Sequence, residues 1–146
     1  MHFLNSVSAS VSAVLRPAGV DKSRGILTAE YLKDPTDPQW QNDPAYTAWV
    51  AWMKKYYPDG DMADAFNVYG YAVSATLVQV LKQCGDDLTR ENVMKQAAHL
   101  DFAAPMLIPG VKVHTAPTDF FPIQEMQLAK FDGKTWQRFG QVLAMQ

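Results

Sequence analysis

Apolar side chains recur every three or four positions over three separate stretches of the chain, which is the spacing of one face of an α-helix. This pattern predicts helices over residues 43–57, 64–84 and 89–99. The first has a clear start, because Asp43 supplies a capping carboxylate and Pro44 suits the first helical position. Gly85 favours the end of the second helix, and Thr89 is a cap for the third.

Three other stretches are rich in β-prone side chains. Residues 25–32 predict a strand, because turn-forming residues bound them on both sides. Residues 122–131 and 134–143 predict two further strands, and Asp132-Gly133 between them is a strong hairpin signal. The helices and strands together predict an α/β fold in which helices pack on strands and a β-hairpin closes the chain.

The segments between these elements give weaker signals. Residues 2–16 alternate serine with valine or alanine, which fits a strand, but they also fit a short strand over 2–6 and a helix over 8–16. Periodicity leaves both interpretations open. Residues 33–44 contain repeated X-Pro dipeptides, which favour extended and turn conformations and predict a connector. Residues 101–121 are predicted to be irregular or extended.

Composition narrows the class of protein. The 146-residue chain is 48% hydrophobic and 19% charged, which is typical of one folded domain and not of a disordered chain. Charged residues interrupt every window, which excludes a membrane-spanning helix. The formal net charge of −2 argues against a nucleic-acid partner. A single cysteine, Cys84, excludes an internal disulfide and a cysteine-based zinc site.

The sequence holds no catalytic or metal-binding motif. His2, His99 and His114 are not spaced as a metal-binding pair. Residues 59–64 begin like a calcium loop but lack its later ligands, so we interpret them as a turn before a helix. Cys84 is predicted at a helix C-terminus, where the helix dipole disfavours a thiolate. We therefore expect no catalytic residue, no metal site and no cofactor, and we expect that the protein is not an enzyme.

Two groups of residues are candidates for a binding site. Phe66, Tyr69 and Tyr71 surround Asn67 at the start of the second predicted helix. These rings fit either packing between elements or the wall of a ligand cleft at a helix N-terminus. The alternating serines of residues 6–12 fit either a solvated strand face or, if a helix begins near them, a cradle for a carboxylate.

Short segments that follow one another over nearly the whole chain carry a family resemblance. They are Gly25-Ile26-Leu27 leading through Tyr31 to Asp34-Pro35, Tyr69-Gly70-Tyr71, Leu88-Thr89-Arg90-Glu91-Asn92-Val93, Leu107-Ile108-Pro109-Gly110-Val111 and Leu128-Ala129-Lys130-Phe131-Asp132-Gly133-Lys134-Thr135-Trp136. In their order and spacing these segments resemble the C-terminal part of the periplasmic solute-binding proteins of branched-chain amino acid ABC transporters. This is the extracellular ligand-binding receptor family, of the type I periplasmic-binding-protein fold.

The resemblance implies part of a two-lobed α/β clamshell that binds its ligand between the lobes. It divides the chain into a second-lobe segment (1–30), a hinge connector (31–42), a first-lobe helical segment (43–121), and a hinge crossing with the closing second-lobe hairpin (122–146). Most of the first lobe would then lie outside this sequence.

The resemblance also implies a function and a location. The chain would be a fragment of the solute-binding component of an ABC uptake transporter, with a membrane permease as partner of the full-length protein. The expected location is the periplasm, although the start of this sequence has no signal-peptide pattern. The alternative function is a stand-alone small α/β enzyme or a protein-interaction domain.

A small-molecule ligand is the expected partner of the site. The candidate contacts are Ser6, Val7 and Ser8 from one lobe and Phe66, Asn67 and Tyr69 from the other. Relatives that bind amino acids carry an acidic residue just after the opening strand, where this chain has Asn5-Ser6-Val7-Ser8. An amino acid-like ligand and an aromatic or aliphatic carboxylate therefore both remain open.

The predicted helices also carry wide apolar faces, which in the complete clamshell would cover a sheet. For the isolated chain we therefore expect a homo-oligomer that buries these faces.

Overall fold

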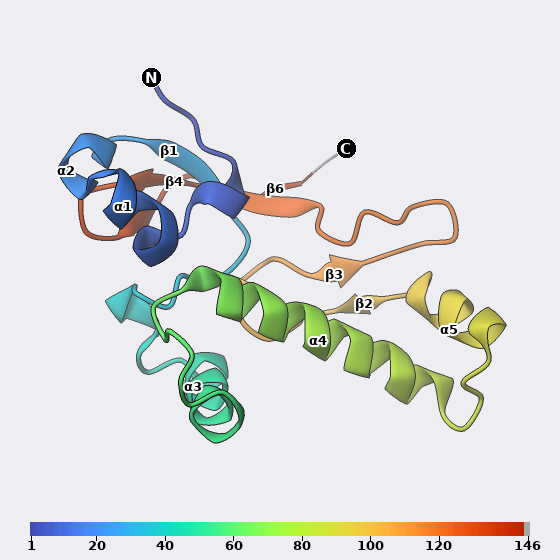
Figure 1. The fold of residues 1–146 in the computed structure, drawn as a ribbon. Coiled ribbons are helices and arrows are strands. Elements are labelled where there is room, and N and C mark those ends of the chain that lie inside the picture. Colours follow the sequence, from blue (N-terminus) through green and yellow to red (C-terminus); the bar gives the residue numbers. More distant parts are fainter. Residues whose placement is uncertain (145–146) are drawn as a thin grey trace.

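The structure of residues 1–144 is given by a computed structural model (Figure 1). Short helical turns form one group of elements with the strands β1 (Leu27–Glu30), β4 (Glu125–Phe131) and β5 (Trp136–Arg138). The helices α3 (Pro44–Tyr56), α4 (Ala65–Cys84) and α5 (Arg90–Ala97) belong to the other group. The chain passes between the two groups after β1 and again before β4. This mixed arrangement of helices and strands confirms the predicted α/β class.

The first group is built on an antiparallel sheet. In it β4 (Glu125–Phe131) lies between β1 (Leu27–Glu30) and β5 (Trp136–Arg138). The register places Leu27 opposite Lys130, and Phe131 opposite Trp136. Side chains of the sheet and of the first fifteen residues share one buried cluster, which consists of Ala9, Val11, Leu15, Ala129, Phe131 and Trp136. The two ends of the chain therefore form one small core.

The predicted hairpin is present, and its turn has the expected chemistry. Asp132 Oδ1 accepts hydrogen bonds from the backbone N–H groups of Lys134 at 2.7 Å and Thr135 at 2.9 Å. Gly133 has a φ of 102°, a conformation that side chains with a Cβ rarely adopt. The second strand of the hairpin is shorter than predicted. It ends at Arg138, where Phe139 N still donates a hydrogen bond to Leu128 O of β4 at 2.9 Å, and a second short strand, β6 (Leu143–Ala144), pairs with β4 further along.

The N-terminal segment resembles the second of its two open interpretations in part, because an extended start precedes helical turns, but no strand spans residues 2–6 and no single helix spans residues 8–16. Phe3 forms a parallel bridge with Leu27, so the first residues lie beside β1. Helical turns follow, namely a 3-10 turn (Ser6–Ser8), a π-helical turn (Val11–Leu15), α1 (Arg16–Ala18) and α2 (Val20–Ser23). The Ser10 side chain accepts a hydrogen bond from Ala13 N, which explains why the longer helical turn starts after Ser10 and not at residue 8.

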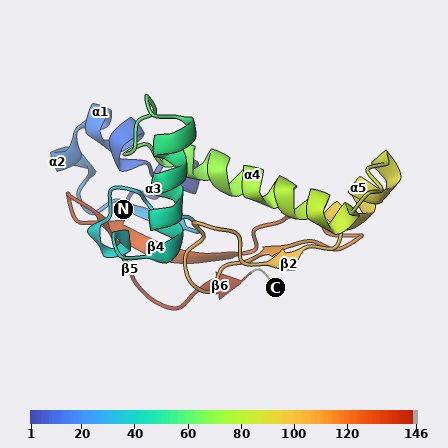
Figure 2. The ribbon, with the colours of Figure 1, turned by 90° about the horizontal axis from the view of Figure 1, so that it is seen from below.

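The three predicted helices are confirmed with bounds that differ by at most two residues. They are α3 (Pro44–Tyr56), α4 (Ala65–Cys84) and α5 (Arg90–Ala97). The side chains of Asp43, Asp64 and Thr89 each accept a backbone hydrogen bond from the first turn of the helix that follows. Figure 2 shows α4 and α5 along one side of the layer that contains β2 (Asp101–Phe102) and β4. A 3-10 turn (Pro38–Trp40) and the short strand β3 (Val113–His114) complete this group.

Two apolar clusters hold the helical group together. Trp49 and Met53 of α3, Val68 of α4 and Met106 form one of them, all fully buried. The other consists of Trp40, Val80, Cys84, Leu100, Ala104, Leu107, Ile108, Val111 and Val113. Cys84 therefore packs in a core, as predicted. Over residues 1–144 no helix has both the length and the apolar character needed to cross a membrane.

The apolar face predicted for α4 is only partly covered. Val68, Ala72, Val80 and Cys84 are buried. By contrast, Tyr69, Val73, Leu77 and Leu81 of the same helix are 40–55% exposed. One side of this helix thus packs inside the chain while a neighbouring apolar side is uncovered.

Candidate functional site

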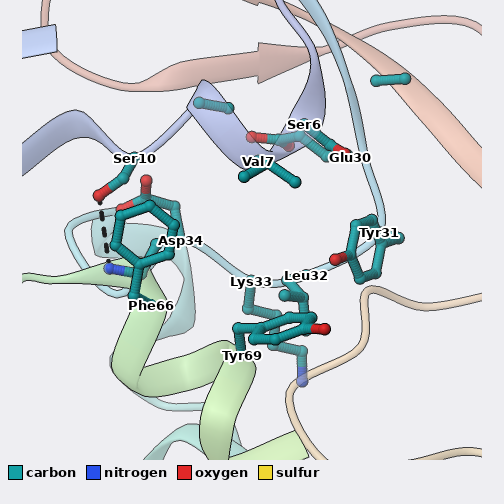
Figure 3. A pocket seen from close by; sticks show the side chains of 13 residues that line it. Ser6, Val7, Ser10, Glu30, Tyr31, Leu32, Lys33, Asp34, Phe66 and Tyr69 are labelled. Atoms are coloured by element: carbon teal, nitrogen blue, oxygen red, sulfur yellow. Dashed lines mark hydrogen bonds between the residues drawn. The ribbon is translucent and has the colours of Figure 1, made fainter. Parts of the chain in front are cut away.

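A cavity of about 300 Å³ lies where the two groups of elements meet, a size that fits a small ligand (Figure 3). Its lining consists of Ser6, Val7, Ala9, Ser10, Ala29, Glu30, Tyr31, Leu32, Lys33, Asp34, Ala65, Phe66 and Tyr69. Figure 3 shows Ser6, Val7 and Glu30 across the space from the aromatic side chains of Phe66 and Tyr69.

Local hydrogen bonds position the N-terminal wall of the cavity. Asn5 Oδ1 accepts from Val7 N at 3.0 Å and so starts the 3-10 turn that carries Ser6 and Val7. Thr28 Oγ1 donates to Leu4 O at 3.0 Å, which fixes this turn beside β1. Ser10 Oγ accepts from Ala65 N at 3.4 Å, a contact that ties the N-terminal segment to the start of α4 (Figure 3).

The opposite wall is aromatic and belongs to the first turns of α4. Phe66 and Tyr69 are three residues apart, so they lie on one face of the helix. Their side chains are 47% and 50% exposed in this chain, although both are large apolar groups. Exposed rings next to a cavity offer a surface for the apolar body of a ligand.

Glu30 is the charged side chain that sequence reasoning missed. It ends β1, and burial raises its pKa from 4.5 to about 8, against the opposing effect of Arg138. Asp34 and Asp37 raise the pKa of Glu30 further through charge repulsion. A signal was present in the sequence, because Glu30 is a charged residue at the end of an otherwise uncharged β-prone run.

Two other charged residues of the lining have internal partners. Lys33 Nζ lies 2.7 Å from Asp43 Oδ1, so its charge is neutralised away from the cavity. Asp34 Oδ1 accepts hydrogen bonds from Thr36 N at 2.8 Å and Thr36 Oγ1 at 2.6 Å. Burial raises the pKa of Asp34, and these bonds from Thr36 oppose that shift.

The structure brings four of the six predicted contact residues to this cavity. Ser6, Val7, Phe66 and Tyr69 line it, whereas Ser8 and Asn67 do not. Asn67 Nδ2 instead donates to Asp61 O at 2.8 Å, which holds the loop before α4. Within the described part of the chain, no group of three metal-ligating side chains lies together.

A second, more open cavity of about 640 Å³ follows the uncovered side of α4. Its apolar lining includes Val73, Leu77, Val80, Leu107, Val113, Ile123 and Met126. It shares Ser6, Tyr31, Leu32 and Tyr69 with the first cavity, so the two cavities adjoin at these residues.

Solved structures of ligand-binding proteins share this fold. A branched-chain amino acid ABC transporter protein from Thermus thermophilus, solved with bound valine, superposes with a TM-score of 0.72 at 13% identity. A possible leucine/isoleucine/valine-binding protein from Rhodopirellula baltica SH 1 gives a TM-score of 0.70 at 16% identity. A solute-binding protein from R. palustris in complex with benzoate gives 0.58 at 21% identity.

These similarities cover almost all of this chain but a minor part of the others. The matches include 99%, 94% and 90% of this chain, and 39%, 35% and 34% of the Thermus, Rhodopirellula and R. palustris chains. The comparison with curated protein sequences returns no match.

The sequence profile described as periplasmic binding protein matches residues 6–135. That range runs from the N-terminal wall of the cavity, through both aromatic residues of α4, to the closing hairpin. The order of elements, the superpositions and this match agree, and the chain belongs to the periplasmic binding protein family.

Proposed function

We propose that this chain is the C-terminal part of the solute-binding component of an ABC uptake transporter. In this role it would capture a small amino acid-like molecule or an aromatic or aliphatic carboxylate. The observation that carries the proposal is the cavity between the two groups of elements, with Phe66 and Tyr69 on one side and Ser6 on the other. Related structures hold valine and benzoate, which are ligands of this size.

Ligand capture would work by closure of two lobes. Residues 1–30 and 122–144 supply the sheet core around Trp136, whereas the segment 43–121 supplies most of the two helical clusters. This division supports 31–42 as a hinge connector and 122–125 as a return crossing. A ligand that touches both sides would favour the closed arrangement, because it gains contacts that the open arrangement lacks.

The same proposal places the full-length protein in the periplasm, where it would deliver ligand to a membrane permease. Family membership supports this location. It also supports binding without turnover, because capture needs no reacting group.

Binding can be tested by isothermal titration of the chain with valine, phenylalanine, benzoate and 3-phenylpropanoate. We expect at least one of these compounds to bind, and we expect Tyr69→Ala to weaken that binding about tenfold by removing one ring of the cavity wall. Tyr56→Ala is the matched control, because Tyr56 lies on α3, is 61% exposed and does not line the cavity. An equal effect of the two variants would contradict the proposed site.

A further inference from the structure

Two hydrogen bonds join the N-terminal segment to the start of α4, and so join one group of elements to the other. The Ser12 hydroxyl donates to Ala63 O at 2.7 Å, and Ser10 Oγ accepts from Ala65 N at 3.4 Å. The partners are 51 and 55 residues apart in the sequence. We propose that these two bonds, here called the clasp, hold the two groups together around the empty cavity, so that a ligand meets a preformed site. This inference rests on the proposed function, because it concerns the same cavity.

The clasp lies at the end of the cavity opposite to the place where the chain crosses between the groups. The first crossing follows Glu30, the last residue of β1, so Tyr31 marks its position. Figure 3 shows Tyr31 at one end of the lining and Ser10, with its bond to Ala65 N, at the other. Separation of the two groups about the crossing would therefore break the bonds of the clasp.

The loop before α4 holds the acceptor of the clasp in place. Asp61 Oδ1 accepts a hydrogen bond from Ala63 N at 2.8 Å. Asp61 O in turn accepts from Asp64 N at 3.2 Å and from Asn67 Nδ2 at 2.8 Å. Because the carbonyl of Ala63 is fixed before the groups meet, forming the clasp orders no further loop. Asn67 is thus a positioning residue for the clasp.

The donor side of the clasp is attached to the sheet core. Ser10 Oγ also accepts from Ala13 N at 3.3 Å, which shapes the π-helical turn that carries Ser12. Val11 and Leu15 of the same turn are 3% and 1% exposed and pack in the sheet core. Both partners of the clasp are therefore fixed within their own groups, so the bonds depend directly on how the groups lie relative to each other.

The two groups have separate cores, so each can keep its packing when they separate. The sheet core contains residues from 9–15 and 129–136, whereas the helical clusters contain residues from 40–113. The contact of α4 with the π-helical turn is therefore a contact between two bodies. One hydrogen bond that is partly shielded from water shifts such an equilibrium about fivefold toward the bonded arrangement. The clasp thus favours the closed arrangement before a ligand arrives.

A preformed site changes the affinity without changing any contact to the ligand. When a ligand binds the closed arrangement, its apparent affinity is proportional to the closed fraction of the empty chain. Loss of the Ser12 hydroxyl should therefore weaken binding by at most about fivefold. Tyr69→Ala should act differently, because it removes a ligand contact and leaves the arrangement of the empty chain unchanged.

Pulsed electron paramagnetic resonance measures the distance between the two groups in the empty chain. Spin labels are attached through Lys22→Cys on α2 and Lys54→Cys on α3, two exposed positions in different groups, in a Cys84→Ala background. Dilution with unlabelled chain restricts the signal to distances within one chain. With the clasp intact we expect one narrow distance. In Ser12→Ala we expect a longer distance to become about fivefold more populated.

The control variants separate the clasp from a general effect on the fold. Ser8→Ala removes the same hydroxyl from the same segment at a position outside the cavity lining, and it should leave the distance unchanged. Ser12→Thr keeps the donor and should keep the narrow distance. The compound that binds most tightly among valine, phenylalanine, benzoate and 3-phenylpropanoate should restore the narrow distance in Ser12→Ala, because its contacts replace the clasp.

The outcomes distinguish failure of this inference from failure of the proposed function. An empty Ser12→Ala chain with the same distances as the unchanged chain would overturn the clasp while ligand capture stands. An equal shift in Ser8→Ala, or a shift that the bound compound does not reverse, would also overturn it. If none of the four compounds binds, the proposed function fails, whereas the distances in the empty chain still decide the role of the clasp. Circular dichroism of Ser12→Ala establishes that the variant is folded.

Discussion

The Trp136 side chain links the two ends of the chain by a hydrogen bond within their shared core. It is 2% exposed, its Nε1–H donates to Ala9 O at 2.8 Å, and its ring centre lies 5.2 Å from that of Phe131. Trp136→Phe removes the donor and leaves a buried carbonyl without a partner and a small void, so we expect a loss of about 2 kcal/mol in the free energy of unfolding. Urea unfolding measures this. Trp52→Phe, at a 39% exposed position, should lower the free energy of unfolding much less. Equal losses in the two variants would contradict the stabilising role of the hydrogen bond from Trp136.

Glu30 makes stability depend on pH in a direction opposite to that of most carboxylates. Between its unfolded pKa of about 4.5 and its folded pKa of about 8, the folded chain keeps a proton that the unfolded chain has released. The free energy of unfolding therefore falls as pH rises through this window, by at most about 1.4 kcal/mol per pH unit. Thermal melts from pH 5 to pH 8 should show Glu30→Gln gaining stability relative to the unchanged chain. Parallel pH profiles for the two proteins would contradict the buried state of Glu30.

At the scale of residues, the sequence alone was sufficient to predict part of the cavity lining. Phe66 and Tyr69 could be predicted because helical spacing places them together at a capped N-terminus. Ser8 and Asn67 are adjacent to true lining residues, and a difference of one position turns a side chain away from the cavity. The position of Glu30 in the cavity wall could not be predicted, because it depends on how the N-terminal turn and the connector lie around the end of β1.

The start of α3 depends on a carboxylate with two tasks. Asp43 Oδ1 accepts from the backbone N–H groups of Ala45 and Tyr46, both at 3.0 Å, and pairs with buried Lys33 at 2.7 Å. The hydrogen bond from Lys33 is the main cause that lowers the pKa of Asp43, so the stabilisation is present above about pH 4 and is lost as pH falls through the lowered pKa.

Two substitutions separate these tasks. Asp43→Asn keeps an N-cap oxygen but removes the charge that balances Lys33, and we expect a loss of about 2–3 kcal/mol in the free energy of unfolding. Asp43→Ala also removes the cap and should cost about 1 kcal/mol more. Denaturant unfolding at pH 7 measures both. Identical stabilities of the two variants would mean that the cap contributes nothing.

At the scale of elements, local signals predicted the helices and the hairpin, because caps and the Asp-Gly turn act within a few residues. The N-terminal segment stayed ambiguous, because its small residues fit both the two-residue period of a strand and the 3.6-residue period of a helix. The pair β2 and β3 is only two residues long in each strand, too short for a period. The predicted strand over 134–143 is interrupted near Gly140, which has a φ of 69° and breaks the pairing with β4.

At the scale of the whole molecule, the chain contains both sides of a cavity but only part of the relatives' length. It spans 35% and 39% of two solved structures that it superposes on over at least 94% of its own length. Family and fold could be recognised from segment order alone. The local sequence pattern of α4 does not show which surface covers its outer side. An apolar helix face has the same sequence whether the surface that packs against it is present or absent.

This uncovered side leads to a prediction for the chain in isolation. Val73 and Leu77 are 50% and 55% exposed, and they line the open cavity of about 640 Å³. At about 25 cal/mol per Å², leaving roughly 400 Å² of apolar surface in water forgoes ~10 kcal/mol, which is comparable to the net stability of a domain. We therefore expect two copies to bury these faces against each other around a two-fold axis.

Light scattering coupled to size-exclusion chromatography measures the mass of the particle over a range of concentrations. We expect a dimer or larger species, and we expect Leu77→Glu to shift it toward monomer by placing a charge on the buried face. Leu88→Glu is the control, because Leu88 is 62% exposed and lies outside the cavity, so its mass should match that of the unchanged chain. A folded monomer at every concentration would show that the α4 face is tolerated in water and that self-association is not needed.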